Sequence, residues 1–173
     1  VVVAELIPDL LTLGEVQRIL ANLLREKVSI RDMPTILEAL ADGARGTRDI
    51  DLLTEQVRQH LGRHITEPLI KQGFLHAVVL SPAIEQQMKE SLEQTDHGTY
   101  LNLDPLIAQR VVNALNRQLA NLPQGVPRVV ISSPYVRMYF KRLTDRLFRD
   151  LTVLSYAEIY SDVGIKTVGV VEL

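Results

Sequence analysis

Two histidines at helical spacing are the first side chains in this sequence that could do chemistry. His60 and His64 lie four residues apart, which would place both imidazole rings on one face of a helix, as helical zinc sites require. Zinc proteases with this spacing also carry a glutamate between the histidines, whereas residues 61–63 are Leu, Gly and Arg. Because no third ligand follows nearby in the sequence, we interpret the pair as part of a solvated helix face and predict no metal site.

Two serines and a glycine-containing loop are the other candidates for catalysis. Ser132 and Ser133 follow a predicted strand, where nucleophiles occur in α/β enzymes, but Pro134 comes next and Ser133 is better placed to cap a helix. The loop at residues 43–46 has two glycines but lacks the lysine and the preceding strand of a nucleotide-binding loop. Zero cysteines exclude thiolate nucleophiles and disulfides. We therefore predict no catalytic residue, no cofactor and no enzymatic activity, with an uncharacterised α/β enzyme as the alternative.

Cationic side chains gather on residues 134–150, which we expect to form one helix. The apolar residues of that helix must face the core, so its cations should share the outer face. A solvated face partly balanced by Asp145 would explain them, and docking of an acidic protein is the alternative, since arginine binds carboxylates through paired hydrogen bonds. The formal net charge of −2 argues against a nucleic-acid partner. The predicted outer face carries Arg137, Lys141, Arg142, Arg146 and Arg149, of which Arg142, Arg146 and Arg149 are the candidate docking residues.

The elements that would position these side chains begin with helices in the first third of the chain. Thr12 and Glu15 form a capping box in front of an amphipathic helix. Asp32 can cap a second helix, which tolerates Pro34 near its start and ends near Gly43. The apolar face of the first helix consists of Val16, Ile19, Leu20, Leu23 and Leu24.

A third helix is predicted after residue 46. It extends to about Thr66, because Pro68 prevents its continuation, and it carries Leu53, Val57, Leu61 and Ile65 at helical spacing. Three consecutive helices without a strand between them indicate a helical subdomain. The pattern changes near residues 71–73, where we place a domain boundary.

The rest of the chain repeats one joint, a strand followed by a capped helix. Each time, an apolar or β-branched run ends in a Ser or Asp that can cap a helix, and a proline suited to the first helical position follows. Residues 152–154 and 166–171 add two more strands. The alternation predicts a sheet covered by helices, partly parallel and mixed where the last two strands adjoin. The joints follow residues 75–80, 99–103 and 128–132, with caps at Ser81, Asp104 and Ser133.

The helix after each joint should bury one apolar face. Apolar residues recur every three or four positions in all three helices, which is the helical period. The complete pattern indicates an α plus α/β fold, a helical subdomain followed by an α/β subdomain. The three predicted faces consist of Ile84, Met88 and Leu92; of Ala108, Val111, Val112, Leu115 and Leu119; and of Val136, Tyr139, Phe140, Leu143 and Leu147.

The composition is that of an ordinary globular protein, with 46% hydrophobic and 23% charged residues. No apolar run approaches the roughly 20 residues that a membrane-spanning helix needs. The sequence starts with three valines and no initiator methionine, so we expect a soluble fragment of a longer protein.

Three blocks of the sequence resemble the FlhA family of type III protein-export gates. Residues 28–38 (VSIRDMPTILE), preceded by LANLL, are similar to the signature of that family. Residues 95–105 (TDHGTYLNLDP) and 132–159 (SSPYVRMYFKRLTDRLFRDLTVLSYAEI) resemble two later segments, in the order that the family has them. The chain departs from the family at residues 160–163 (YSDV), where a turn containing proline is expected.

The resemblance implies a membrane-anchored protein at the cytoplasmic face of the bacterial inner membrane. Its cytoplasmic domain would have four subdomains and assemble as a nonameric ring. This chain would hold the last two, a helical third subdomain at residues 1–72 and an α/β, thioredoxin-like fourth subdomain at residues 73–173. Because the chain has no cysteine pair, that shape implies no redox activity.

Members of the family receive export substrates and chaperones and couple them to translocation through the stalk protein of the export ATPase complex. The chaperone groove is built mainly from the first two subdomains, which would be absent here. The third subdomain is implicated in ring contacts and the fourth in contacts with the stalk. We therefore take Arg31 and Asp32 as structural or ring-contact candidates. The block at residues 95–105 favours a flagellar gate, and an injectisome (virulence) gate is the alternative.

Overall fold

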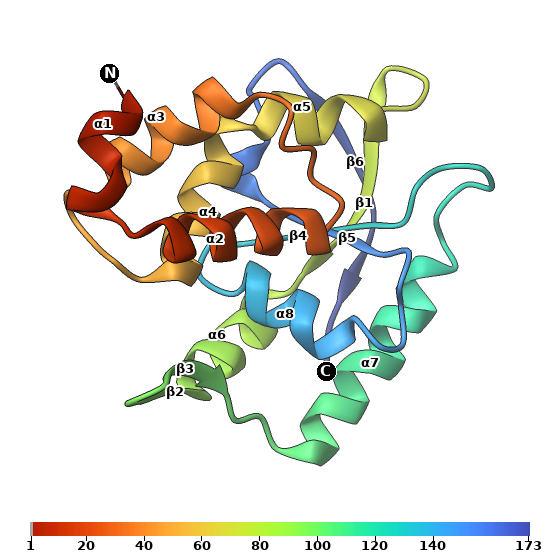
Figure 1. Ribbon diagram of the computed structural model, residues 1–173. Coiled ribbons are helices and arrows are strands. Elements are labelled where there is room, and N and C mark those ends of the chain that lie inside the picture. The colour runs from red at the N-terminus through yellow and green to blue at the C-terminus, as the bar shows by residue number, and fades with distance from the viewer. Residues whose placement is uncertain (1) are drawn as a thin grey trace. The chain divides into compact units, whose positions relative to one another are not determined.

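The computed structural model describes residues 2–173, which form two compact units, each with its own apolar core (Figure 1). The first unit ends at Pro68, and the second spans Leu69–Leu173. The first is helical, whereas every strand that the structure describes lies in the second.

Amphipathic helices make up the first unit. Their apolar residues, spaced three and four apart, turn toward one core that contains the fully buried Ile19, Leu23, Ile36, Leu40 and Val57. The elements are α1 (Val2–Glu5), η1 (Leu6–Leu10), α2 (Leu13–Arg25), α3 (Met33–Gly43), α4 (Ile50–His60) and α5 (Gly62–Thr66), and η2 (Glu67–Leu69) crosses the boundary to the second unit.

The predicted starts of α2 and α3 are confirmed. The Glu15 N–H donates to Thr12 Oγ1 at 3.1 Å, and the Thr12 N–H donates back to Glu15 Oε1 at 2.9 Å. At α3 the Thr35 N–H donates to the Asp32 carboxylate at 3.3 Å, and Pro34 lies in the first turn. Each cap provides an acceptor for N–H groups that have no partner inside the helix, so local sequence fixes where both helices begin.

The predicted third helix is interrupted at Leu61. α4 ends at His60 and α5 begins at Gly62, and Leu61 between them has φ −94° and ψ 9°. Glycine in a helix interior is about 1 kcal/mol less favourable than alanine, which weakens the helix at this point. Leu61 is buried in the core, so the break leaves the apolar contacts in place. His60 and His64 consequently belong to different helices.

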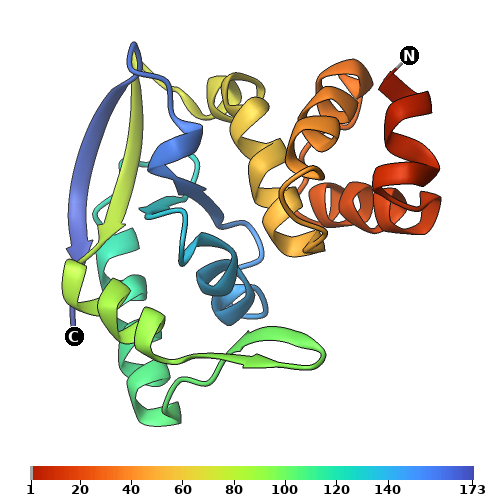
Figure 2. The same cartoon turned by 90° about the vertical axis from the view of Figure 1, so that its left-hand side faces the viewer.

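A four-stranded parallel sheet forms the centre of the second unit, in the order β5-β4-β1-β6 (Figures 1 and 2). Val78 pairs with Val130, which in turn pairs with Val153. Side chains on both faces of β1 and β4 are buried, which accounts for their continuous apolar runs. The strands are β1 (Phe74–Leu80), β4 (Val129–Ser132), β5 (Thr152–Ser155) and β6 (Gly164–Val171).

The expectation of a mixed arrangement is wrong for this sheet. β5 and β6 follow each other in the sequence, but they lie at opposite edges of the sheet. The connection between them, which begins with η3 (Tyr156–Glu158), returns the chain to the amino end of β1, where Gly164 pairs with Phe74. β6 therefore runs parallel to β1 and forms no hairpin with β5.

Three helices pack against the sheet around one core, and two of their predicted caps are confirmed. The Ile84 N–H donates to Ser81 Oγ at 3.2 Å, and the Leu106 N–H donates to the Asp104 carboxylate at 2.8 Å. The helices are α6 (Pro82–Glu90), α7 (Pro105–Leu119) and α8 (Arg137–Thr144), and their buried residues share the cluster that contains Val78 and Val130.

The middle joint is a separate hairpin, not a strand of the main sheet. β2 (Leu92–Thr95) pairs antiparallel with β3 (Gly98–Leu101). Leu92, which we predicted on a helical face, lies in β2 because α6 ends at Glu90. Thr95 Oγ1 donates to the Gly98 carbonyl at 2.8 Å, and Gly98 has a φ of +114° that glycine adopts easily. Turn chemistry at residues 95–98 thus overrides the helical spacing that ends at Leu92.

Candidate functional site

Arg31 and Asp32, the candidates in the first unit, have different environments. Arg31 is exposed, and only its backbone N–H is engaged locally, with Ser29 Oγ at 3.2 Å. Asp32 caps α3 and also accepts from Thr35 Oγ1 at 2.7 Å. The Thr35 side chain and N–H, with a smaller contribution from His64 at 3.6 Å, lower the pKa of Asp32 below its ordinary value. Asp32 is therefore structural, and Arg31 remains available for a contact.

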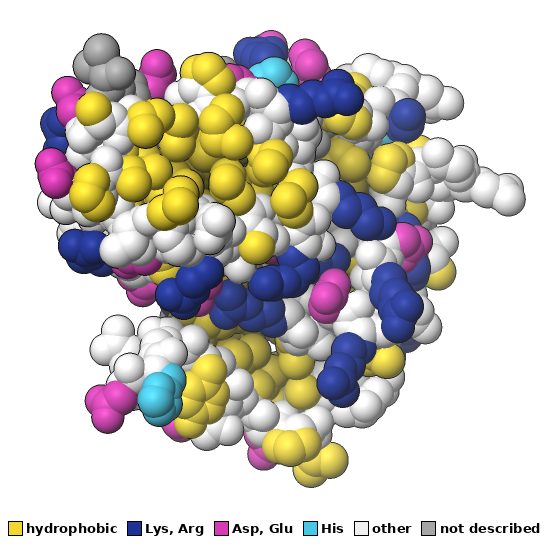
Figure 3. Space-filling model, viewed as in Figure 1, with side chains coloured by type: hydrophobic (Ala, Val, Ile, Leu, Met, Phe, Trp, Pro, Cys, Tyr) yellow, Lys and Arg dark blue, Asp and Glu magenta, His cyan; other side chains and the backbone are white. Residues whose placement is uncertain are grey.

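The first unit carries an apolar face on α2 and α3. Leu13 and Leu24 of α2 have more than half of their surface exposed, and Leu20 between them is only partly buried. Met33 and Leu37 of α3 are also partly buried. Figure 3 shows apolar side chains gathered over this part of the unit. We call Leu13, Leu20, Leu24, Met33 and Leu37 the helical apolar face; contiguous exposed apolar surface of this kind is typical of protein contacts.

The segment after β4 is shorter as a helix than its sequence predicts. The apolar spacing predicts a helix over residues 134–150, but α8 spans Arg137–Thr144. Thr144 Oγ1 donates to the Phe140 carbonyl at 2.9 Å, a side-chain bond that competes with helix continuation. Leu147, which we expected on the buried face, is 65% exposed.

Ser133 does not cap α8, contrary to the prediction. The residue before the helix is Val136, and no side-chain hydrogen bond caps this end. The Ser133 carbonyl accepts from the N–H groups of Val136 and Arg137 at 3.3 and 3.2 Å, and the Ser133 N–H donates to Glu85 Oε1 at 3.1 Å. Ser133 Oγ is buried and has no hydrogen-bond partner among residues 2–173. A turn held by main-chain groups takes the place of the cap.

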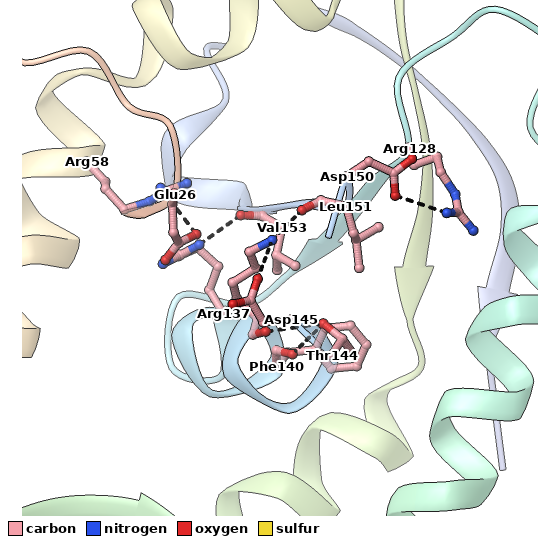
Figure 4. Close-up of polar contacts among 11 residues, drawn as sticks. Glu26, Arg58, Arg128, Arg137, Phe140, Thr144, Asp145, Asp150, Leu151 and Val153 are labelled. Atoms are coloured by element: carbon pink, nitrogen blue, oxygen red, sulfur yellow. Dashed lines mark hydrogen bonds and ion pairs between the residues drawn. The ribbon is translucent and has the colours of Figure 1, made fainter. Parts of the chain in front are cut away.

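Arg137 and Lys141 are buried, which corrects the prediction of one outer face for all the cations; Figure 4 shows Arg137 beside Val153. Arg137 is 0% exposed and donates from Nη1 to the Val153 carbonyl at 2.9 Å. Lys141 is 8% exposed and donates from Nζ to the Leu151 carbonyl at 2.6 Å. Helical spacing alone therefore assigned these two side chains to the wrong environment.

The buried cations satisfy the edge strand β5. Since β5 pairs only with β4, carbonyl groups on its other side need donors from elsewhere. Arg137 Nε also lies 3.7 Å from the Glu158 carboxylate, which accepts from the Ser155 N–H at 3.2 Å. A buried charge of either sign is tolerated only when it is paired and hydrogen-bonded. The Ser-x-x-Glu spacing of Ser155 and Glu158 was the sequence signal for this network, because it places a carboxylate at the end of a buried strand.

Arg142, Arg146 and Arg149 are exposed, as a docking role requires. The Arg142 guanidinium lies 6.0 Å from the centre of the Tyr139 ring. Within the part of the chain that the structure describes, Arg146 and Arg149 have no ion-pair partner. We call Arg142, Arg146 and Arg149 the exposed arginine group.

The acidic residues beside the exposed arginine group are already engaged. Asp145 lies 3.3 Å from Lys141 Nζ, and Asp150 accepts from Arg128 at 3.0 Å. Their carboxylates are directed to other cations, so the positive charge of Arg146 and Arg149 is available to an external carboxylate.

The carboxyl edge of the sheet is the place where α/β enzymes bind ligands, and its polar side chains were candidates for catalysis. Ser81 caps α6, and Ser132 Oγ donates to the Ser133 carbonyl at 3.0 Å. Burial, with a smaller contribution from Glu85, raises the pKa of Tyr156 above its ordinary value. At this edge Ser81 thus serves as a helix cap and Ser132 as part of a turn.

Residues 2–173 show no cluster of side chains typical of a metal centre and no helix typical of a membrane span. No group of three His, Asp or Glu side chains in that range could hold a metal ion, and His64 Nε2 instead lies 3.6 Å from Asp32. None of the helices in that range combines the length and apolar character that a bilayer crossing demands.

Comparison with known proteins gives one family throughout. The profile of the FHIPEP family matches residues 1–164. The flagellar biosynthesis protein FlhA of Bacillus subtilis is 41% identical over 175 residues, covering 100% of this chain and 26% of that protein. The protein MxiA of Shigella flexneri is 34% identical over 160 residues, covering 88% of this chain and 23% of that protein. The chain thus spans about a quarter of the length of these relatives.

Solved structures agree in fold along the whole chain. The Chlamydia pneumoniae CdsV and CdsO protein complex contains a chain that matches with a TM-score of 0.91 and 32% identity, over 99% of this chain and 51% of that one. The nonameric EscV cytosolic domain from the type III secretion system matches with a TM-score of 0.82 and 32% identity, over 99% and 51% of the two chains.

Proposed function

Because the chain belongs to the FHIPEP family, we propose that it is the C-terminal part of the cytoplasmic portion of a type III protein-export gate. In this proposal it acts as a docking and ring-forming module, not as an enzyme, at the cytoplasmic face of the bacterial inner membrane. The observation that carries the proposal is the match to FlhA over 100% of this chain, at 41% identity. The first unit would be the third subdomain of the family, residues 1–72, and the second the thioredoxin-like fourth, residues 73–173.

A flagellar role is favoured over an injectisome role. The identity to the flagellar relative is 41% over the full chain, against 34% over 88% of the chain for MxiA. Export substrates and chaperones would be received mainly by subdomains outside this chain.

Ring assembly would use the first unit. The helical apolar face leaves leucines exposed on α2, and burial of each leucine in a contact contributes about 1.5 to 3 kcal/mol. The nonameric state of the EscV cytosolic domain supports self-association of a chain with this fold. Arg31, exposed beside the capping Asp32, would lie at the polar margin of that contact.

Docking of the stalk protein of the export ATPase would use the second unit. The complex of CdsV with CdsO shows that a relative of this chain binds a second protein. The exposed arginine group offers guanidinium groups that bind carboxylates through paired hydrogen bonds. Its partner would therefore present acidic side chains.

A pull-down with the stalk protein of the same organism tests this role. Wild type is compared with Arg142→Glu, Arg146→Glu and Arg149→Glu combined, and the matched control changes three exposed arginines elsewhere, Arg18, Arg45 and Arg117, to Glu. We expect capture to fall at least about tenfold for the first set only, since each charge pair lost or reversed at an interface weakens binding strongly. Equal capture of all three proteins would remove the docking assignment.

A further inference from the structure

The parallel sheet of the second unit has two edges, and side chains of α8 occupy one of them. At β5, Arg137 and Lys141 donate to main-chain carbonyl groups. β6 forms the opposite edge, at the outer margin of the sheet in Figure 2, and within residues 2–173 no strand pairs with its other side. An open strand edge is a template for pairing with a strand of another molecule. β6 therefore needs a protection of its own if copies of this protein are to stay free of edge pairing.

β6 has the length and composition that favour edge pairing. It spans eight residues, Gly164–Val171, has no proline, and carries Ile165 and Val170, each with 38% of its surface exposed. The Val171 carbonyl accepts from the Ser81 N–H at 3.0 Å, on the side of β1. Because main-chain groups alternate along a strand, the N–H and carbonyl of Val170 point to the open side. A long edge strand with exposed β-branched residues is expected to associate.

A bulge interrupts this edge in its second half. Ala77 and Val78 are neighbours in β1, but their partners in β6 are Thr167 and Gly169. Val168 therefore has no place in the ladder. Bulges are rare between parallel strands, and a bulge bends its strand and increases the local twist. A second strand cannot continue a regular ladder across such a point, so the bulge divides the open edge into two shorter parts.

Two amide side chains, at and just beyond the end of α7, contact the bulge. Asn121 Nδ2 donates to the Val168 carbonyl at 3.4 Å and to Gln118 Oε1 at 3.1 Å. Gly169, the next residue of β6, permits this close approach. A Cβ added at Gly169 would collide with Gln118 Oε1 and would lie 3.3 Å from Asn121 Nδ2. The glycine and the two amides thus fit one another, and we call Gln118 and Asn121 the α7 amide clamp.

We propose that the α7 amide clamp protects the β6 edge, because by holding the bulge at Val168 it prevents β6 from pairing with β6 of a second copy of this chain. A second copy is the occupant that the open edge would otherwise accept, since one strand can pair with itself across a twofold axis. Loss of the clamp frees the Val168 carbonyl, which can then accept from an N–H of the second strand. The inference does not depend on the docking role proposed above.

Cross-linking of the complete chain through an introduced cysteine measures this pairing, since the chain has no cysteine of its own. Thr167→Cys places a thiol on β6, and a short bismaleimide, whose reach covers small shifts in register, joins two copies that lie edge to edge. Gln118→Ala with Asn121→Ala removes the clamp. The matched control is Gln109→Ala with Asn113→Ala, an amide pair elsewhere on α7 in which Gln109 Nε2 donates to Asn113 Oδ1 at 3.0 Å.

We expect removal of the clamp to increase the cross-linked dimer by at least about fivefold, because the freed carbonyl gains a hydrogen bond in the pair of strands. The control with Gln109→Ala and Asn113→Ala should give as little dimer as the protein with an intact clamp. A reference cysteine, Leu52→Cys, lies at an exposed position of the first unit and reports contacts that do not involve β6. Its cross-linking should be the same in all three backgrounds.

Asn121→Asp tests the clamp with a smaller change. The carboxylate keeps the size of the amide but cannot donate to the Val168 carbonyl, so cross-linking through Thr167→Cys should rise for this variant as well. Unchanged cross-linking through Thr167→Cys in both clamp variants would overturn the inference. An equal rise through Leu52→Cys would also overturn it, since that result would mean a general loss of folding and not the exposure of one strand edge.

Discussion

Helices α2 and α8 both carry cations, yet only on α2 do all of them lie where helical spacing predicts. Arg18 and Arg25 of α2 are exposed, and its Val16, Ile19 and Leu23 face a core of other helices. In α8, Arg137 and Lys141 are buried against carbonyl groups at the edge strand β5. A helix that packs on helices needs only an apolar face, whereas one beside an open strand edge must also supply donors.

The largest expected effect on stability distinguishes the buried Arg137 of α8 from the exposed Arg18 of α2. Replacing Arg137 by Met removes a cation from beside the buried Glu158 carboxylate and a donor to the Val153 carbonyl, so we expect a loss of about 3 to 5 kcal/mol in the free energy of unfolding. Arg18→Met on α2 should change it by less than about 0.5 kcal/mol. Urea unfolding followed by amide NMR signals of each unit measures both values.

The matched control for that prediction removes both charges. The double variant Arg137→Met, Glu158→Leu should recover part of the lost stability, because it removes the buried carboxylate together with its cation, although the hydrogen bonds to the Val153 carbonyl and from the Ser155 N–H stay lost. A similar loss from Arg18→Met and Arg137→Met would contradict the distinction between the two helices.

A smaller effect concerns how the helices begin. α2 starts with the Thr12–Glu15 capping box, while α8 has no side-chain cap. Thr12→Ala should lower the stability of the first unit by about 1 kcal/mol, since two N–H acceptors are disturbed. Thr12→Ser, which keeps the hydroxyl, should stay close to wild type in the same urea titration. A loss shared by both variants would show that the methyl group, not the cap, matters.

The end of α2 offers a stabilising change. Lys27 follows α2 with a φ of +62°, and the N–H of Val28 donates back to the Leu23 carbonyl at 3.0 Å, the arrangement in which glycine is favoured. Lys27→Gly should raise the stability of the first unit by up to about 1 kcal/mol, by relieving the left-handed backbone. Lys27→Ala keeps a Cβ at that φ and should bring no comparable gain; thermal unfolding of both variants decides.

The smallest effect is a pH dependence at the α2 cap. The Thr12 N–H, followed by Arg48, lowers the pKa of Glu15 below its ordinary 4.5. A group with a lowered folded pKa contributes stability that is present above the unfolded pKa and is lost as pH falls through the folded one. Stability should therefore decline below about pH 4.5, and Glu15→Gln should make that decline shallower. Identical slopes for the two proteins in urea titrations at several pH values would rule out this contribution.

Local signals predicted much of the fold. Capping residues Thr12, Asp32, Ser81 and Asp104 all mark helix starts that the structure confirms, because a cap depends on neighbours within three residues. The strands β1, β4, β5 and β6 were likewise recognised from their apolar runs. The exposure of Arg142, Arg146 and Arg149 also followed from the sequence.

The predictions that the structure contradicts concern features that depend on residues far apart in the sequence. The direction of β6 depends on where the chain re-enters the sheet, and the burial of Arg137 depends on carbonyl groups sixteen residues away, at Val153. Neither the direction of β6 nor the burial of Arg137 can be predicted from the residues of a single helix or strand. The strand before Asp104 and Pro105 was predicted in the main sheet from its residues and the proline joint alone. That prediction did not consider the turn through which β3 pairs with β2.

The position of β6 has a consequence for biosynthesis. In the second unit β1 pairs with β6, Leu80 with Val171, so β1 has no neighbour on that side until residues 164–171 have been synthesised. Nearly the entire unit must leave the ribosome before its sheet can close, and contacts of such long sequence separation form slowly. Until then the apolar β1 has an unpaired edge that is prone to aggregation.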